Sequence, residues 1–428
     1  MRGLRILHVT PYSAEAWAYG GIPRVVAALI SGLANRGHDV TICATDAGGP
    51  NARLGAEPLA LEAWPPSTRN GVTLRVFPNV SNRAAYHAQL FLPIGLGGFL
   101  RRHAREYDVA HLHACRNLPG VIAARHLRAA GVPYVLAPNG TAINIERRRL
   151  AKQVFDLMFG NSVMRGASRL IAVSEAERAQ LHQLDVPDAA VRVVPNPIDL
   201  SEFSPPPVRG RFLATHLPHG ARAVLFLGRL SPRKRVDDLI AAFARLRAAG
   251  RFSNVWLIVA GNDMGSGGRI RALLAAAGVE DRARMIGLLE GRQRLEALAD
   301  ADVVVYPSEH EIFGLVPLEA LLAGTPVVVA GDSGCGEVIS SIGGGQVVPA
   351  ADVDALTSAI AAVLDHPDRY RAAAVDAAAR VRQRFARDPV CRAIEEIYLE
   401  LCPSQATARS SPEHTRSPRP AIGAGVAS

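Results

Sequence analysis

The sequence has few cysteines, and none of them stands at a paired spacing. The five are Cys43, Cys115, Cys335, Cys391 and Cys402. Their scatter argues against a disulfide-stapled secreted protein and favours a reducing compartment. The sequence also lacks a run of 18 apolar residues, so we expect no helix that crosses a bilayer. Residues 1–20 lack the apolar core of a signal peptide. These absences predict a cytoplasmic protein.

Aromatic residues are scarce as well, at 5%, and no nucleic-acid recognition motif is present. We therefore expect no nucleic-acid partner, despite a net charge of +9. Part of that charge lies in residues 146–159, and Phe99–His103 is a second basic and apolar patch. On a helix, residues 146–159 place basic side chains beside an apolar stripe, which suits an anionic membrane surface. The alternative is that Leu150, Val154 and Leu157 face the core while the arginines are solvated.

The sequence is rich in short apolar runs that alternate with amphipathic segments. A chain of 428 residues is too long for one core, and two domains are the natural division. The alternation predicts an α/β protein with parallel sheets covered by helices on both faces. The Pro-rich run 204–207 marks the linker. The predicted strands are Arg5–Thr10, Asp39–Ala44, Thr73–Phe77, Val109–His113, Tyr134–Ala137, Leu170–Ser174 and Val191–Val194, then Val224–Gly228, Val255–Gly261, Met285–Gly287, Val303–Pro307, Val327–Ala330 and Gln346–Val348.

The most informative segment places Glu311 and Glu319 around a turn between an apolar strand and an apolar helix, Leu315–Ala323. Helix N-termini carry unpaired N–H groups that suit phosphate. A carboxylate beside such a site accepts hydrogen bonds from two hydroxyls of a sugar. Phosphate and sugar sites side by side indicate a nucleotide-sugar. The alternative is an ordinary strand-turn-helix unit with two surface acids.

A second segment follows the strand Val224–Gly228 and contains Arg229 and Lys234. A diphosphate leaving group gains negative charge as its bond to the sugar breaks, and cationic side chains must meet that charge. Arginine offers a bidentate fork and lysine a point charge. The alternative is a solvated basic loop that caps the strand.

A third segment, Gly20-Gly21, follows the first strand and precedes a helix with Pro23 in its first turn. Proline is favoured there because its missing N–H was unpaired anyway. Glycines let a backbone approach a phosphate closely.

These three segments together resemble the family 4 retaining glycosyltransferases. Glu311 and Glu319 match the family's E-x7-E signature. Ile312 stands where the family usually has a glycine, and its larger side chain can narrow the pocket. Arg229 and Lys234 match G-R-L-x-x-x-K-G, with Arg235 in place of the last glycine. The resemblance extends over most of residues 4–402.

The resemblance implies the GT-B architecture, in which two Rossmann-like domains face each other across a cleft. The N-terminal, acceptor-side domain would then span 1–205 and the C-terminal, nucleotide-sugar-binding domain 206–387. Residues 388–402 would form a helix that crosses back onto the first domain. Residues 403–428 lack apolar periodicity, and we expect them to be disordered.

The resemblance also implies roles for individual residues. Glu319 would accept hydrogen bonds from ribose and Glu311 from the sugar, while Arg229 and Lys234 would hold the diphosphate. His113 would lie near the sugar. Asn139, where many relatives have a histidine, would lie on the acceptor side. The remaining donor-side residues are Gly20, Gly21, Gly228, Phe313, Gly314 and Leu315.

No metal or other cofactor is expected, although three further patterns deserve weighing. Asp300 and Asp302 match a D-x-D metal motif, but they directly precede a buried strand. His111, His113 and Cys115 alternate along one strand and could hold zinc. The glycine-rich run 261–268 resembles a dinucleotide turn without the required third glycine.

The expected reaction is retaining transfer of a sugar from a nucleotide-diphosphate sugar to a hydroxyl acceptor. A lipid-linked acceptor, an inner membrane surface and a role in polysaccharide or glycolipid assembly follow from the resemblance. A nucleotide-sugar epimerase of the same fold, or an inactive relative, is the alternative. The sequence does not reveal the base, the sugar, the acceptor or the oligomeric state.

Overall fold

The computed structural model describes residues 3–12, 16, 19–49, 53, 72–143 and 153–402. The predicted tail 403–428 and residues 146–152 of the basic segment lie outside this part.

The first domain is built on a parallel seven-stranded sheet with the order β3-β2-β1-β4-β5-β6-β7. Buried Val, Ile and Leu side chains line both faces of its central strands, as expected for a sheet that helices cover on both sides. The strand order reverses between β1 and β4, where ligands of such sheets usually bind. The strands are β1 Arg5–Val9, β2 Asp39–Thr45, β3 Val72–Phe77, β4 Val109–His113, β5 Tyr134–Ala137, β6 Arg169–Ala172 and β7 Val191–Val193.

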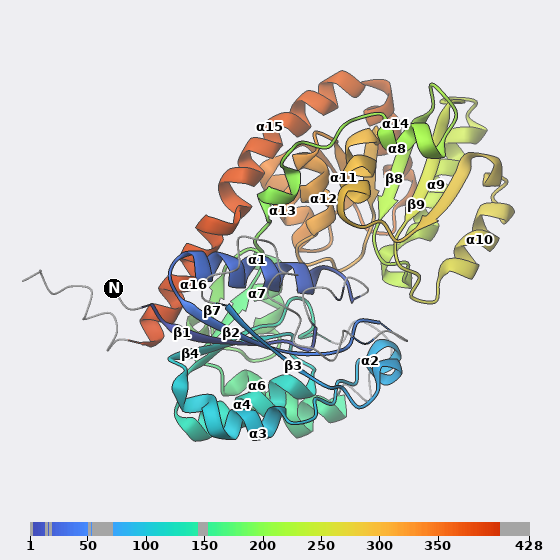
Figure 1. The fold of residues 1–428 in the computed structure, drawn as a ribbon. Coiled ribbons are helices and arrows are strands. Elements are labelled where there is room, and N and C mark those ends of the chain that lie inside the picture. Colours follow the sequence, from blue (N-terminus) through green and yellow to red (C-terminus); the bar gives the residue numbers. More distant parts are fainter. Residues whose placement is uncertain are drawn as a thin grey trace, which may run out of the picture.

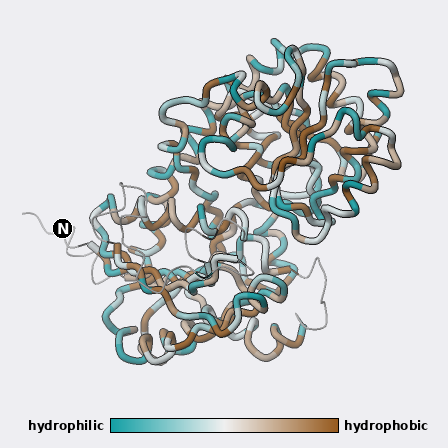
Figure 2. Tube along the Cα trace, turned by 45° about the vertical axis from the view of Figure 1, so that its right-hand side comes forward, coloured by the Kyte–Doolittle hydropathy of each residue, from teal (hydrophilic) through white to brown (hydrophobic). Residues whose placement is uncertain are grey.

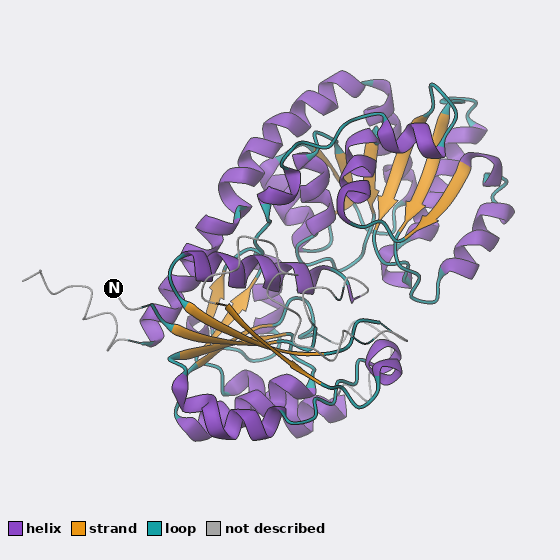
Figure 3. Cartoon of the chain, viewed as in Figure 1, coloured by secondary structure: helices purple, strands orange, loops and turns teal. Residues whose placement is uncertain are grey.

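The second domain repeats this plan with a parallel six-stranded sheet in the order β10-β9-β8-β11-β12-β13. Figure 3 shows each sheet between two layers of helices, and in Figure 2 the hydrophobic colour gathers along the strands. The strands are β8 Arg222–Leu227, β9 Val255–Ala260, β10 Ala283–Gly287, β11 Val303–Tyr306, β12 Val327–Ala330 and β13 Gly345–Val348.

The helices connect successive strands and cover the sheets. Those of the first domain are α1 Gly21–Asn35, α2 Asn82–Ala88, α3 Leu96–His103, α4 Leu118–Ala130, α6 Asn161–Arg165 and α7 Glu175–His182. Those of the second are α8 Arg211–His216, α9 Val236–Ala248, α10 Gly267–Ala276, α11 Gly291–Asp300, α12 Leu315–Leu322, α13 Gly334–Ile342, α14 Val353–Asp365 and α15 Pro367–Phe385.

The last described helix, α16 (Arg387–Leu401), returns to the first domain. In Figure 1, α15 runs from the second domain toward the first, and α16 lies beside α1. Val390, Ile394 and Tyr398 share a core with α1 and the first sheet. The chain thus crosses between the domains twice.

The two domains also contact each other directly. The Glu337 carboxylate of α13 accepts hydrogen bonds from the backbone N–H groups of Glu175 and Ala176 at the start of α7, at 3.1 and 3.0 Å. Asn262, after β9, donates to the Tyr86 hydroxyl of α2 at 3.0 Å. These contacts hold the carboxyl ends of the two sheets together.

The α/β fold with two Rossmann-like domains is confirmed, and all thirteen predicted strands are present within a residue or two. Among the described helices, none combines the length and hydrophobicity that a bilayer span requires.

Candidate functional site

The three predicted motifs meet where the two domains touch. Each lies beyond the carboxyl end of a strand: Gly20-Gly21 after β1, Arg229 after β8, and the Glu311 loop after β11. A Cβ atom added at Gly21 would lie 2.9 Å from Leu315 Cδ1, and one added at Gly20 would lie 3.2 Å from Arg229 Nε. Glycine at these positions therefore allows the close approach, and Gly20 also has a φ of 97° that favours glycine.

Lys234 and Glu311 form a buried ion pair at the centre of this region. The Lys234 ammonium also donates to the Tyr306 hydroxyl at 2.6 Å and lies 4.6 Å from the centre of that ring. The Glu311 carboxylate accepts from Tyr306 at 3.1 Å and from Ser308 at 3.3 Å. Tyr306, which the motif analysis did not single out, thus connects the two predicted site residues.

Lysine is rare in this chain. Lys152 and Lys234 are its two lysines, against 48 lysines and arginines in all. At position 234 a compact ammonium fits between a ring and a carboxylate in a space that leaves Lys234 only 5% exposed. A planar guanidinium does not match this geometry.

The ion pair shifts the pKa values of both partners. Burial raises the pKa of Glu311, but the Lys234 ammonium outweighs burial and brings the pKa to about 2, from an ordinary 4.5. Burial lowers the pKa of Lys234, and Glu311 opposes this shift. Glu311 is therefore ionised at any neutral pH.

This shift predicts a pH dependence of stability. Since the pKa of Glu311 is lowered on folding, its contribution is present above about pH 4.5 and is lost as the pH falls toward 2. The contribution is on the order of 3 kcal/mol. Urea unfolding between about pH 6 and about pH 3 should show a steeper loss for the wild type than for the double variant Lys234→Met/Glu311→Gln. Equal slopes would contradict the shift.

The N-terminus of α12 is suited to bind an anion. Gly314 precedes it with a φ of 78°, and no side chain caps the helix. A Cβ atom at this position would lie 2.5 Å from Cys335 Sγ, so glycine is required for two reasons. Phe313 packs edge-on against Phe385, with the ring centres 5.6 Å apart. The amides at the start of α12 thus remain open to a ligand in the described structure.

Glu319 is fully buried on α12 and lies between two arginines. Arg24 of α1 approaches Glu319 Oε1 to 2.6 Å, and Arg294 of α11 pairs with Oε2. Burial raises the pKa of Glu319, but the two guanidinium groups together hold it below its ordinary value. Glu319 belongs to a sequence motif, whereas the two arginines belong to none and could not be predicted in this way. Their only sequence signal is an arginine on the apolar face of an amphipathic helix.

His113 lies at the end of β4 but is buried. Its Nε2 atom lies 3.0 Å from His8 Nδ1, so one imidazole donates an N–H to the other. Burial lowers the pKa of His113 to about 3, so the ring is neutral. His111 stacks on His113 and forms a 2.6 Å hydrogen bond with Tyr398 of α16. In the predicted zinc triad, His8 therefore takes the place of Cys115, and a direct hydrogen bond occupies two of the ring nitrogens.

Asn139 lies on the same side of the interface, with a φ of 51°. Its Oδ1 atom is buried without a hydrogen-bond partner. The next residue, Gly140, donates to the buried Glu177 carboxylate at 2.6 Å, which fixes the loop. Ile312 approaches from the other domain, with side-chain atoms 3.1 Å from the Cβ position of Gly140. The substitution of isoleucine for the family glycine thus fills space between the domains.

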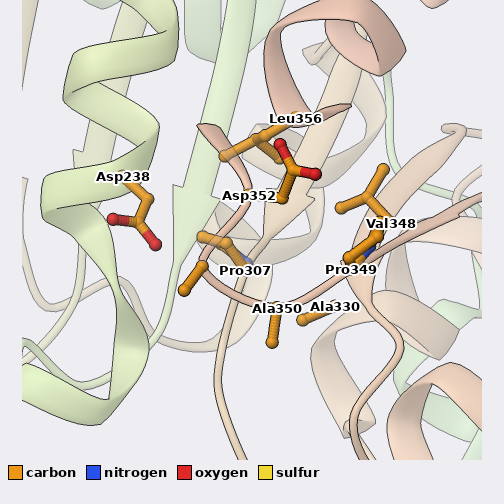
Figure 4. Close-up of a pocket in the computed structure, with 9 residues that line it drawn as sticks. Asp238, Pro307, Ala330, Val348, Pro349, Ala350, Asp352 and Leu356 are labelled. Atoms are coloured by element: carbon orange, nitrogen blue, oxygen red, sulfur yellow. The ribbon is translucent and has the colours of Figure 1, made fainter. Parts of the chain in front are cut away.

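Two small cavities lie near these residues. One of about 20 Å³ has Asn139, His111 and His113 in its lining, together with residues of α1 and α16. The other, of about 10 Å³, lies between Asp238, Pro307 and Asp352 (Figure 4) and includes none of the predicted site residues. Each has room for about one water molecule at most. Neither cavity is large enough for a nucleotide-sugar.

The remaining alternatives lie elsewhere or serve the fold. Asp300 accepts hydrogen bonds from the backbone at Gly210 and Leu213. Asp302 accepts one from Ala223 and pairs with Arg222 at the start of β8, opposite the end that carries Arg229. In the glycine-rich run 261–268, Asp263 Oδ1 accepts three backbone N–H groups in the turn before α10.

Comparisons with known proteins identify the family. The profile "Glycosyl transferases group 1" matches residues 213–381, and "Glycosyltransferase Family 4" matches residues 19–202. A D-inositol 3-phosphate glycosyltransferase from Kineococcus radiotolerans is 32% identical over 332 residues, which cover 72% of this chain and 75% of the relative. One from Catenulispora acidiphila is 30% identical over 72% of this chain and 78% of the relative.

Solved structures agree with the fold. Sucrose-phosphate synthase from Thermosynechococcus elongatus has a TM-score of 0.74 at 22% identity and covers 95% of this chain and 100% of its own. Anabaena HepE in complex with UDP-glucose has a TM-score of 0.70 at 21% identity, with 93% and 100% covered. The chain therefore belongs to glycosyltransferase family 4 and is a glycosyltransferase with the GT-B fold.

Proposed function

We propose that this protein transfers a sugar from a nucleotide-diphosphate sugar to a hydroxyl acceptor with retention of configuration and without a metal ion. The observation that carries the proposal is the convergence of Gly20-Gly21, Arg229, Lys234 and the open N-terminus of α12 at the domain interface. The positive charges of Arg229 and Lys234 and the open backbone amides of α12 are thus directed at one region of the interface. A diphosphate is the ligand that this combination fits.

The proposed reaction follows from this arrangement. The bond between the anomeric carbon and the diphosphate oxygen breaks, and the diphosphate keeps the electron pair. Arg229, Lys234 and the amides of α12 stabilise the charge that develops. The acceptor oxygen forms the new bond on the face that the diphosphate leaves, and its proton passes to a diphosphate oxygen. Glu311 is held by Lys234 and Tyr306, so its carboxylate orients sugar hydroxyls and does not serve as a nucleophile.

Closure of the domains would then exclude water from the reaction. Water in the site would hydrolyse the donor in place of transfer to the acceptor, and a closed interface limits this hydrolysis. His113 is neutral at any physiological pH and contributes hydrogen bonding without a change of charge. Asn139 and Ile312 face the acceptor side, where an amide can both donate to and accept from a hydroxyl.

The names of similar proteins support a nucleotide-sugar donor. HepE structures contain UDP, or UDP with glucose, or UDP-glucose. Two similar proteins are named D-inositol 3-phosphate glycosyltransferase. Both Glu311 and Glu319 are present with buried cationic partners, which favours a transferase over an inactive relative.

The test is release of nucleoside diphosphate from a panel of nucleotide-sugars, with and without EDTA. We expect slow, chelator-resistant release from one donor, and loss of that release in Glu319→Ala. Release that requires a divalent cation would contradict metal independence. Interconversion of the donor sugar without release of diphosphate would instead support an epimerase.

We further propose that the first domain acts at an anionic membrane surface. Val154, Leu157 and Met158 are 55%, 81% and 61% exposed, so the alternative in which Val154 and Leu157 face the core is wrong. Leu157 and Met158 lie in the π-helical segment Asp156–Gly160, which continues directly into α6. Helices α3 and α6 both pack against α4, and Arg101 and Arg102 of α3 are exposed. Exposed apolar and basic side chains therefore share one helical layer, at the bottom of Figure 1.

This surface gives a direct prediction for vesicle binding. The double variant Leu157→Glu/Met158→Glu should bind vesicles of phosphatidylglycerol and phosphatidylcholine at least about tenfold more weakly, because two apolar side chains no longer insert. Val375→Glu is the matched control, since Val375 is 57% exposed on α15 of the other domain. Equal loss in both variants, measured by vesicle sedimentation, would rule out this surface.

A further inference from the structure

The carboxylate that the proposed function assigns to ribose is buried between two arginines. Glu319 is 0% exposed, and its two oxygens face different arginines: Oε1 faces Arg24 and Oε2 faces Arg294. Ribose hydroxyls can reach this buried carboxylate only if a group that covers it moves, and the two guanidinium groups are in direct contact with it. The two arginines differ in origin, because Arg24 comes from the first domain while Arg294 comes from the same domain as Glu319.

A second carboxylate shares both arginines. Glu202 lies in the short helix Leu200–Phe203, on the segment that joins the two sheets. Arg24 Nη2 lies 3.0 Å from Glu202 Oε2 and 3.3 Å from Oε1, and Arg294 pairs with Glu202 Oε2. Two arginines and two glutamates thus form one ion cluster that connects α1, the linker, α11 and α12. We call these four residues the Arg24 cluster.

Burial makes this cluster a poor device for stability alone. Arg294 and Glu319 are buried, whereas the side chains of Arg24 and Glu202 are 16% and 30% exposed. Removing the buried charges from water costs several kcal/mol per ion, and the ion pairs repay that cost only in part. Such clusters are best attested where they select one conformation over another. Arg24 also contacts both Glu202 oxygens, so it keeps ionic partners after it leaves Glu319. The same withdrawal by Arg294 would leave Glu319 without any partner from its own domain.

We propose that Arg24 is a positioning residue that acts as a donor-displaced latch between the domains. Without donor, Arg24 holds Glu319 and keeps the interface closed. Bound ribose takes the Glu319 oxygen from Arg24, which then remains on Glu202 in the linker. Ribose and Arg24 therefore compete for Glu319, and by linkage donor binding and the Arg24–Glu319 contact each weaken the other by the same factor. This inference rests on the proposed role of Glu319 as the ribose acceptor.

The latch predicts opposite effects for two neighbouring substitutions. Arg24→Gln removes the competitor for Glu319, so the nucleoside diphosphate should bind about three- to tenfold more tightly. Glu202→Gln removes the second partner of Arg24, so Arg24 should hold Glu319 more tightly. The nucleoside diphosphate should then bind more weakly by a similar factor. Arg24→Lys keeps the charge but cannot reach both glutamates at once, and should lie between the wild type and Arg24→Gln. A cluster that only supports the fold would give weaker binding in all three variants.

The experiment is calorimetric titration of the full chain with UDP, GDP and ADP, followed by the 2′-deoxy counterpart of whichever binds. The preference for the ribose form over the 2′-deoxy form reports whether the carboxylate engages the sugar. We expect this preference to rise in Arg24→Gln and to fall in Glu202→Gln. Arg36→Gln is the matched control, because Arg36 joins α1 to Glu395 and Asp388 of α16, away from Glu319.

Each outcome distinguishes the latch from the function on which it rests. If the wild type binds one of the diphosphates but Arg24→Gln and Glu202→Gln shift affinity in the same direction, the latch is wrong and the transferase stands. If Arg24→Gln weakens binding while its ribose preference is unchanged, Arg24 contacts the diphosphate directly and the latch is again wrong. If the wild type binds none of the three, the assignment of Glu319 to ribose falls, and the latch falls with it.

Discussion

Lys234→Met should lower turnover by about 10²- to 10³-fold, because the diphosphate loses a preorganised positive charge where its own charge develops. Lys234 lies in the interior between Tyr306 and Glu311, so its ammonium is fixed before the donor arrives. The Michaelis constant for the donor should change much less than turnover, since the charge grows only as the bond breaks. Initial rates at saturating donor are the measurement.

Stability must be separated from catalysis in this variant. Loss of Lys234 leaves Glu311 as a buried carboxylate without its cation, which costs about 3–5 kcal/mol of folding free energy. The double variant Lys234→Met/Glu311→Gln removes both charges and should recover much of that stability without recovering turnover. Lys234→Arg keeps the charge but not the compact shape, and should also be slow. A double variant that is both stable and fully active would contradict the assignment of Lys234 to the leaving group.

Glu319→Gln should raise the Michaelis constant for the donor about 10- to 100-fold, with a smaller effect on turnover. The carboxylate would hold ribose hydroxyls through charge-assisted hydrogen bonds worth about 1.5–3 kcal/mol, and ribose is remote from the bond that breaks. The glutamine has the same size, so packing on α12 is preserved. Steady-state kinetics at varied donor concentration separate the two constants.

The matched control for this substitution is Glu395→Gln. Glu395 of α16 is also a buried carboxylate, and it pairs with Arg36 at 2.6 Å and with His38 at 3.1 Å. Both variants lose a buried charge, and urea unfolding should show comparable destabilisation. If the Michaelis constant for the donor rose equally in both variants, Glu319 would support the fold and would not contact the donor.

Much of the fold follows from the sequence because its signals are local. The apolar runs of β8, β9 and β11 are rich in Val, Ile and Leu and are buried on both faces, which marks a parallel sheet before any contact is known. The helix α9 (Val236–Ala248) has Asp237 and Asp238 in its first turn, where the helix dipole favours negative charge. The motif residues could likewise be placed at strand ends.

The contacts between distant residues could not be predicted in this way. Arg24 and Glu319 are separated by nearly three hundred positions, and only the docking of the two domains brings them together. The pairing of His8 with His113 requires β1 and β4 to be neighbours in the sheet, which periodicity does not reveal. Tyr306 reads as one more apolar strand residue until its hydroxyl is seen between Lys234 and Glu311.

Ile312 illustrates the limit for specificity. The sequence shows only that a bulky side chain replaces a glycine, whereas the structure shows that this side chain lies against Gly140 of the other domain. Its consequence depends on the distance between the domains when the donor is bound. The acceptor side is thus set by the relative position of two loops that lie far apart in the sequence.

The central claim is that residues of the chain, and not a metal, stabilise the departing diphosphate while the acceptor attacks from the same face. The most direct test is proton NMR of the product formed in EDTA from an α-configured nucleotide-sugar. The account predicts an α-linked product at an unchanged rate. A β-linked product, or a reaction that stops in EDTA and resumes with magnesium, would contradict it.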